Sequence, residues 1–270
     1  MSANLKALCI LASIIVIGFV VMSVHSEKKG DAGDTITLTG MITPDTFLAF
    51  KDRLANSSAK NKTFLVTESG GGSWESALAL GILIHRHGWN VEVVDLCASS
   101  CANFIFPAGK VKYLHGNTLL LFHGGPHQEN LLSKSIETEQ AAISGIPAEA
   151  GDSDRARMEG QVSIDDKGAQ RLQVLEFLSI RNLATAADYV ASLTSASDRF
   201  YEELGVNVQL PTYGQTGRYE PTYKAYKLGG FMYRLDSLGR LGIGNIELKD
   251  GEWHPERHRY YPDIYEVTYP

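Results

Sequence analysis

Residues 63–88 read TFLVTESGGGSWESALALGILIHRHG, and this stretch decides the fold class. The run TFLVT at 63–67 is short, apolar and rich in β-branched residues, which is typical of a strand. Three glycines at 70–72 then form a turn. The apolar pattern from Trp74 to His87 predicts a helix that ends at Gly88. The stretch therefore predicts a strand, a glycine turn and a helix in direct succession.

The same alternation of strands and helices continues on both sides of this stretch. The predicted strands are 35–39, 91–94 and 119–122, and the predicted helices are 43–54 and 102–108. Strands that alternate with helices favour an α/β fold with substantial parallel pairing. We therefore expect one α/β domain over residues 35–250.

The second half of that domain gives weaker signals. A polar stretch near 127–167 predicts a surface insertion. Further helices are expected at 169–181, 184–193, 196–204 and 235–241, and a last strand at 243–248. The aromatic residues 251–270 predict a C-terminal arm that either covers the protein's own surface or binds a partner.

The N-terminal segment is apolar. Residues 7–24 read ALCILASIIVIGFVVMSV, 18 residues without a charge. A run of this length predicts a membrane signal anchor or a cleaved signal peptide over residues 1–26, followed by a linker at 27–34. Either interpretation exports the domain, and we expect it in the periplasm or another extracytoplasmic space, anchored to the inner membrane.

Composition excludes several other classes of protein. The 270 residues are 44% hydrophobic and 21% charged, which argues against a disordered chain or a coiled coil. The formal net charge of −6 gives no general attraction to phosphate backbones, so no nucleic-acid partner is expected. No P-loop, dinucleotide fingerprint or metal motif is present, and we predict no cofactor and no metal.

Three features stand where predicted strands end, the place where α/β sheets put their sites. They are the glycine turn 70–72, the turn CASSC at 97–101, and His123. A serine attacks an acyl carbon only if a base takes its proton and amides hold the oxyanion. This pattern predicts Ser100 as nucleophile and His123 as its base. The amides of Gly71 and Cys101 would form the oxyanion hole.

The two cysteines of the CASSC turn are four residues apart. Around the start of a helix, the Cα atoms of Cys97 and Cys101 would be about 6 Å apart, within disulfide range. We therefore predict a disulfide that brackets Ser100. Two free buried thiols and a redox-active thiol pair remain as alternatives.

These motifs together resemble the Clp-protease and crotonase superfamily, and most closely its exported Clp-like serine proteases. The similar segments are 68–81, 99–102, 107–109 and 119–123, with Gly70 in place of the family's proline. The resemblance covers roughly residues 35–126. It implies a superhelix of repeated ββα units, a peptide or protein substrate bound as an added strand, and assembly into a homo-oligomer.

One departure from the family concerns the acidic member of the catalytic triad. The family places this carboxylate about a dozen residues before a Gly-Leu pair, whose counterpart here is Gly242-Ile243. Counting back leads to Gly230, and its neighbours carry no carboxylate. Asp198, Glu202 and Asp236 are the remaining candidates for this third member.

Three functions follow as hypotheses. The first is an exported, membrane-tethered serine peptidase that works through a Ser-His acyl-enzyme. The second is a non-catalytic relative that binds an extended peptide or a partner in the glycine-lined groove. The third is a crotonase-like acyl-CoA enzyme, which shares the oxyanion hole but uses a carboxylate in place of the serine and histidine.

Overall fold

A parallel sheet forms the centre of the molecule, for which a computed structural model describes residues 33–125, 166–181, 185–225 and 230–270. The strand order is β1-β2-β3-β4-β7, and β5 also pairs with β3. The strands are β1 (Asp34–Thr39), β2 (Lys62–Ser69), β3 (Asn90–Ala98), β4 (Lys112–Leu114), β5 (Leu119–Leu121) and β7 (Ile246–Leu248). The predicted α/β class with parallel pairing is confirmed.

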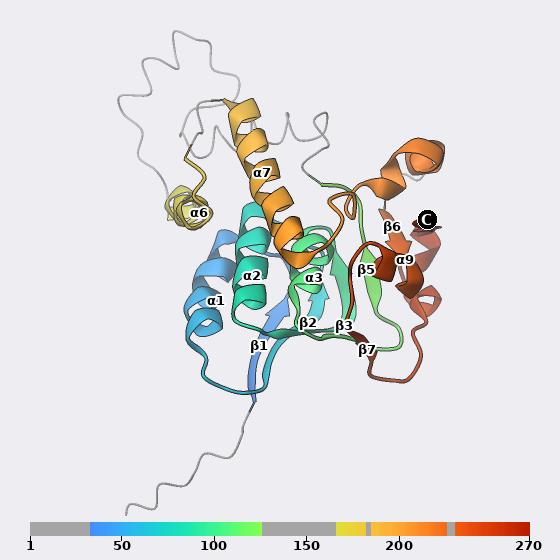
Figure 1. Ribbon diagram of the computed structural model, residues 1–270, viewed down its shortest axis with the longest axis horizontal. Coiled ribbons are helices and arrows are strands. Elements are labelled where there is room, and N and C mark those ends of the chain that lie inside the picture. Colours follow the sequence, from blue (N-terminus) through green and yellow to red (C-terminus); the bar gives the residue numbers. More distant parts are fainter. Residues whose placement is uncertain (1–32, 126–165, 182–184, 226–229) are drawn as a thin grey trace, which may run out of the picture. The chain divides into compact units, whose positions relative to one another are not determined.

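Helices α1 (Pro44–Asn56), α2 (Trp74–Arg86) and α7 (Ala186–Leu204) lie side by side (Figure 1). Thr43 caps α1 through a reciprocal capping box with Thr46. Ser73 caps α2 by accepting a bond from the Ser76 amide at 3.2 Å. α2 also contacts α6 (Asp166–Phe177), so residues 75–81 are buried on every side of the helix. These caps fix where each helix starts relative to the strand before it.

β3 pairs with three other strands of the sheet, β2, β4 and β5. Its first part, Val91 to Val93, pairs with β4, and its last part, Leu96 to Ala98, pairs with β5. Between the two, Thr118 Oγ1 donates to the Val93 carbonyl at 2.9 Å. The predicted strand at 91–94 was thus too short, because pairing with β5 continues the strand through Cys97 and Ala98.

The predicted helices 184–193 and 196–204 are one continuous helix, α7. Serine is less favoured inside helices than at caps and turns, because its hydroxyl competes for backbone hydrogen bonds. In the helix, Ser197 Oγ donates to the Leu193 carbonyl at 2.9 Å, and Arg199 donates to Ser195 Oγ at 2.7 Å. These local bonds satisfy both hydroxyls inside the helix.

The C-terminal residues 251–270 fold back onto the domain. β8 (Ile264–Val267) pairs in parallel with β6 (Gly230–Tyr233), a pair that the sequence did not indicate. The Tyr269 ring packs against Tyr213 with a centroid distance of 4.8 Å. The segment expected as an arm therefore contributes a strand and part of the core.

Two predicted segments lie outside the described residues. They are the N-terminal apolar segment 1–26 with linker residues 27–32, and nearly all of the polar insertion near 127–167. Within the described ranges, no helix combines the length and the apolar character needed to cross a membrane. The predicted signal anchor or signal peptide stays a prediction.

Lys112, the first residue of β4, is a buried cation. Its side chain donates to the carbonyls of Gly109 (2.7 Å) and Gly244 (3.1 Å), and burial lowers its pKa from 10.5 to about 8. Between these two pKa values the unfolded chain binds more protons than the folded one. Stability therefore rises with pH across this window.

We expect Lys112→Met to remove this rise. From pH 7.5 to 9.5, the free energy of unfolding of the parent should increase by about 2 kcal/mol relative to the variant. Urea unfolding at several pH values measures the difference. Lys110→Met, which alters an exposed lysine two residues away, should keep the parental pH dependence. Equal pH dependence in the parent and Lys112→Met would contradict the burial argument.

Candidate active site

The carboxyl ends of β2, β3 and β5 lie next to one another. Ser69 pairs with Cys97 at the end of β2, and Cys97 pairs with Leu120 of β5. The glycine turn, the CASSC turn and His123 each follow one of these three strand ends. The sheet therefore brings together the three features that the sequence singled out.

The glycine turn is held by bonds to the chain after β1. The Ile42 amide donates to the Gly71 carbonyl at 2.8 Å, and Ser69 Oγ donates to the Gly40 carbonyl at 2.8 Å. Ser69 Oγ also accepts a bond from the Gly71 amide at 3.2 Å. This amide, predicted as an oxyanion donor, thus has an acceptor that a substrate oxygen would have to replace.

Gly71 faces the CASSC turn and has no room for a side chain. Its φ is +88°, and an added Cβ would lie 2.6 Å from Ser99 Cβ and 2.9 Å from Ser100 N. A glycine is therefore required for the two turns to approach each other this closely. Backbone amides brought together at the end of a sheet are the chemical basis of an oxyanion hole.

The CASSC turn leads directly from β3 into a short helix, formed by Cys101–Ile105 and α3 (Phe106–Ala108). The Ser99 carbonyl accepts the first helical bond, from the Asn103 amide at 2.9 Å. The amides of Ser100 and Cys101 precede that bond and so need acceptors from outside the helix. The predicted oxyanion donor, the Cys101 amide, is therefore not used by the helix, and neither is the Ser100 amide.

The two serines of this turn differ in their surroundings. Ser100, the predicted nucleophile, is 4% exposed, and its Oγ has no hydrogen-bond partner within the described part of the chain. Ser99 is half-buried and has a left-handed backbone, with a φ of 56°. A buried hydroxyl without a partner is uncommon and requires an explanation.

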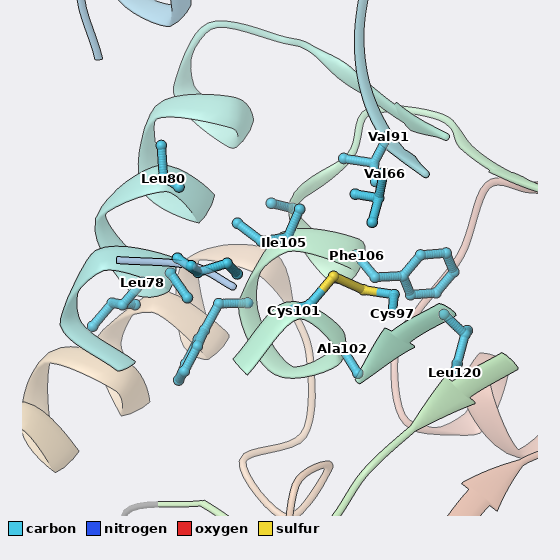
Figure 2. Close-up of a cluster of buried hydrophobic side chains, with 14 of the residues drawn as sticks. Val66, Leu78, Leu80, Val91, Cys97, Cys101, Ala102, Ile105, Phe106 and Leu120 are labelled. Atoms are coloured by element: carbon cyan, nitrogen blue, oxygen red, sulfur yellow. A yellow bond between two sulfur atoms is a disulfide. The ribbon is translucent and has the colours of Figure 1, made fainter. Parts of the chain in front are cut away.

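Cys97 and Cys101 form a disulfide between the end of β3 and the first turn of the helix (Figure 2). The sulfur atoms are 2.01 Å apart and the Cα atoms 5.3 Å apart, which agrees with the predicted pair. Both residues are completely buried. The bond links the two ends of the segment that carries both serines.

We expect reduction of this disulfide to lower the free energy of unfolding by about 2 kcal/mol, the chain-entropy value for so short a loop. Urea unfolding of the oxidised and reduced forms measures the loss. A Cys9→Ala background removes the third thiol, and Cys97→Ala/Cys101→Ala provides a form that reductant cannot change. Identical stability of the oxidised and reduced forms would contradict a structural role for the bond.

His123 follows β5 and is exposed at its surface. The protein around the ring still removes enough water to lower its pKa below 6.5, although a hydrogen bond with its own backbone opposes the shift. A lowered pKa keeps the imidazole neutral near pH 7, which is the form a general base requires. Within the described residues, its ring forms no hydrogen bond to a carboxylate.

The surroundings of the three acidic candidates differ. Glu202 and Asp236 are exposed, and Asp236 lies 3.7 Å from Arg240. Asp198 is half-buried on α7. At Gly230, the position to which the resemblance assigned the acidic residue, an added Cβ would lie 2.8 Å from the Leu121 side chain. This position is next to the strand that carries His123 but offers no carboxylate.

The sequence did not single out Asn103, which connects the two halves of the site. Asn103 is 3% exposed, and its Nδ2 donates to the Gly124 carbonyl at 2.9 Å. Tyr201 of α7 donates to the Asn103 carbonyl at 3.1 Å. A polar residue within the apolar helix after CASSC was the one available signal. Asn103 fixes the peptide that follows His123 to the helix that follows the serines.

No protein-family profile matches this sequence, and no curated protein is significantly similar to it.

Proposed function

We propose that this chain is an exported, membrane-tethered serine peptidase of the Clp-like type, which hydrolyses peptide bonds through an acyl-enzyme. The observation that carries the proposal is the close approach of Gly71 to the serine-bearing turn and the Ser100 amide. An exposed histidine of lowered pKa follows the adjacent strand. These are the parts that acyl transfer requires.

In the proposed reaction, a serine hydroxyl of the CASSC turn attacks the substrate carbonyl carbon while His123 takes its proton. The sequence assigns this role to Ser100. The new oxyanion is held by amides of the CASSC and glycine turns, for which the sequence assigns Cys101 and Gly71. When the C–N bond breaks, His123 returns the proton to the leaving amine. Water, deprotonated by His123, then releases the acyl group and restores the serine.

Three further features of the proposal come from the sequence and the resemblance. They are the signal segment that would tether the domain outside the cytoplasm, the superhelix of ββα units, and assembly into a homo-oligomer. The disulfide supports an oxidising compartment, since such bonds persist mainly outside the cytosol. The position of Gly230 beside Leu121 supports the resemblance to Clp-like enzymes, because it places the family's acidic position near His123.

A second candidate function is a non-catalytic protein that binds an extended peptide. The observation that favours it is that Gly230 and its sequence neighbours carry no carboxylate, where the resemblance to Clp-like enzymes expects the acidic member of the triad. Loss of the acidic member lowers triad catalysis by orders of magnitude but leaves some activity. Direct kinetics can therefore separate the two functions.

The test is acylation of the full-length oxidised protein, in detergent, by p-nitrophenyl acetate. A peptidase should release a burst of p-nitrophenol of about one equivalent per active site, followed by slow turnover. The burst rate should fall at low pH in one proton step, with a midpoint below pH 6.5, because the pKa of His123 is lowered. A folded protein that gives no burst, and cleaves no unfolded protein substrate, would support the binding function.

A further inference from the structure

We infer that the attacking residue is Ser99, and that the amide of Ser100 is an oxyanion donor. This inference rests on the proposed function, and it replaces the sequence-based assignment of Ser100 and Cys101. Three properties of the turn carry it: the backbone of Ser99, the burial of Ser100, and the position of Gly71.

The backbone of Ser99 is unusual for a residue with a side chain. Its φ of 56° lies in the left-handed region, which non-glycine residues adopt at a cost in free energy. Ser99 stands between β3 and the following helix. A serine in a strained strand-to-helix turn presents its hydroxyl at the end of the sheet, as a nucleophile needs. Ser100 has ordinary helical angles.

Access to solvent separates the two serines. Attack requires the carbonyl carbon within about 3 Å of the serine oxygen. Ser100 Oγ is closed off from solvent, whereas the Ser99 side chain is half-buried. Of the two hydroxyls, the one at Ser99 is the more open to a substrate.

The position of Gly71 agrees with this assignment. A Cβ on Gly71 would lie 2.6 Å from Ser99 Cβ, 2.6 Å from the Ala98 carbonyl oxygen and 2.9 Å from Ser100 N. The glycine turn therefore packs directly on the part of the CASSC turn that holds Ser99 and the Ser100 amide. In strand-to-helix nucleophile turns, the amide of the residue after the nucleophile is the expected donor.

The segment that carries the base is bonded to Ser99. The Ser99 amide donates to the Leu121 carbonyl at 2.9 Å, continuing the pairing of β3 with β5. This bond fixes Ser99 beside the segment that reaches His123 two residues later. Ser99 is half-buried and His123 is exposed, so neither is closed off from a substrate.

The test maps the adduct of a fluorophosphonate probe on the full-length oxidised protein. After labelling, the disulfide is reduced and alkylated, and fragment ions of the peptide from His87 to Lys110 distinguish Ser99 from Ser100. We expect the adduct on Ser99. Ser99→Ala should lose labelling by about 1000-fold or more, whereas Ser100→Ala, which removes the buried hydroxyl and keeps the backbone amide, should still take the adduct on Ser99.

Ser99→Gly is the second variant, because glycine adopts the left-handed backbone without strain and preserves the fold. It should retain the thermal transition of the parent and still fail to label. An adduct on Ser100, or normal labelling of folded Ser99→Gly, would overturn the assignment and leave the peptidase proposal intact. A folded parent that takes no label would overturn the proposed function, and this inference with it.

Discussion

Replacing His123 with Gln should lower the rate of serine acylation by about 1000-fold or more, because no other group would take the hydroxyl proton. Glutamine keeps a similar size and polarity but cannot act as a base. The ring is exposed, so the free energy of unfolding should change little. Labelling rate and urea unfolding, measured on the same preparation, separate the two effects.

His87→Gln is the matched control. His87 follows α2 at the opposite end of the sheet from the glycine turn, so this substitution should leave acylation unchanged. If His123→Gln labels as fast as the parent, His123 is not the base. If both variants lose labelling together with stability, the effect of His123 is structural.

Replacing Gly71 with Ala should reduce acylation and also destabilise the protein. The new Cβ would lie 2.6 Å from both the Ala98 carbonyl oxygen and Ser99 Cβ. These neighbours are backbone and the nucleophile turn itself, so relief of the clash must move the site. We expect a loss of about 100-fold in acylation rate, the scale of removing one oxyanion donor.

Gly40→Ala is the control that measures how much a positive φ alone lowers the free energy of unfolding. Gly40 has a φ of +85°, close to that of Gly71, but an added Cβ meets nothing within 4 Å. This variant should be destabilised by about 1 kcal/mol through the left-handed conformation alone. Gly71→Ala should be less stable by about 2 kcal/mol more, the scale of overpacking. Equal stability and equal acylation rates in the two variants would contradict the close approach of Gly71 to the serine turn.

The sequence predicted the elements whose signals are local. The strand, glycine turn and helix at 63–88 were found because alternation, glycines and a capping serine all lie within one short stretch. The disulfide was predictable for the same reason, since four residues around a helix start leave little freedom in Cα separation.

Features that depend on distant residues were missed. The strand predicted at 91–94 continues to Ala98, because its last residues pair with β5 at 119–121. β6 and β8 are four residues each and exist because they pair across more than 30 positions. Short strands of this kind carry too little periodicity to be distinguished from loops.

The candidate site was likewise predictable where its signals are local and not where they depend on distant residues. The sheet topology follows from the alternation of elements, and it brings the glycine turn, CASSC and His123 to one edge. The left-handed angle of Ser99 and the burial of Ser100 depend on how β3 joins the helix beneath α7. No residue pattern in CASSC distinguishes one serine from the other, so that choice required the structure.

The central claim is that the CASSC turn holds a serine activated by His123. Its most direct test is the intact mass of the full-length oxidised protein after incubation with a fluorophosphonate, with His123→Gln alongside. We predict one adduct per chain in the parent and none in His123→Gln over the same incubation time. A folded parent without an adduct, or equal labelling of both proteins, would contradict it.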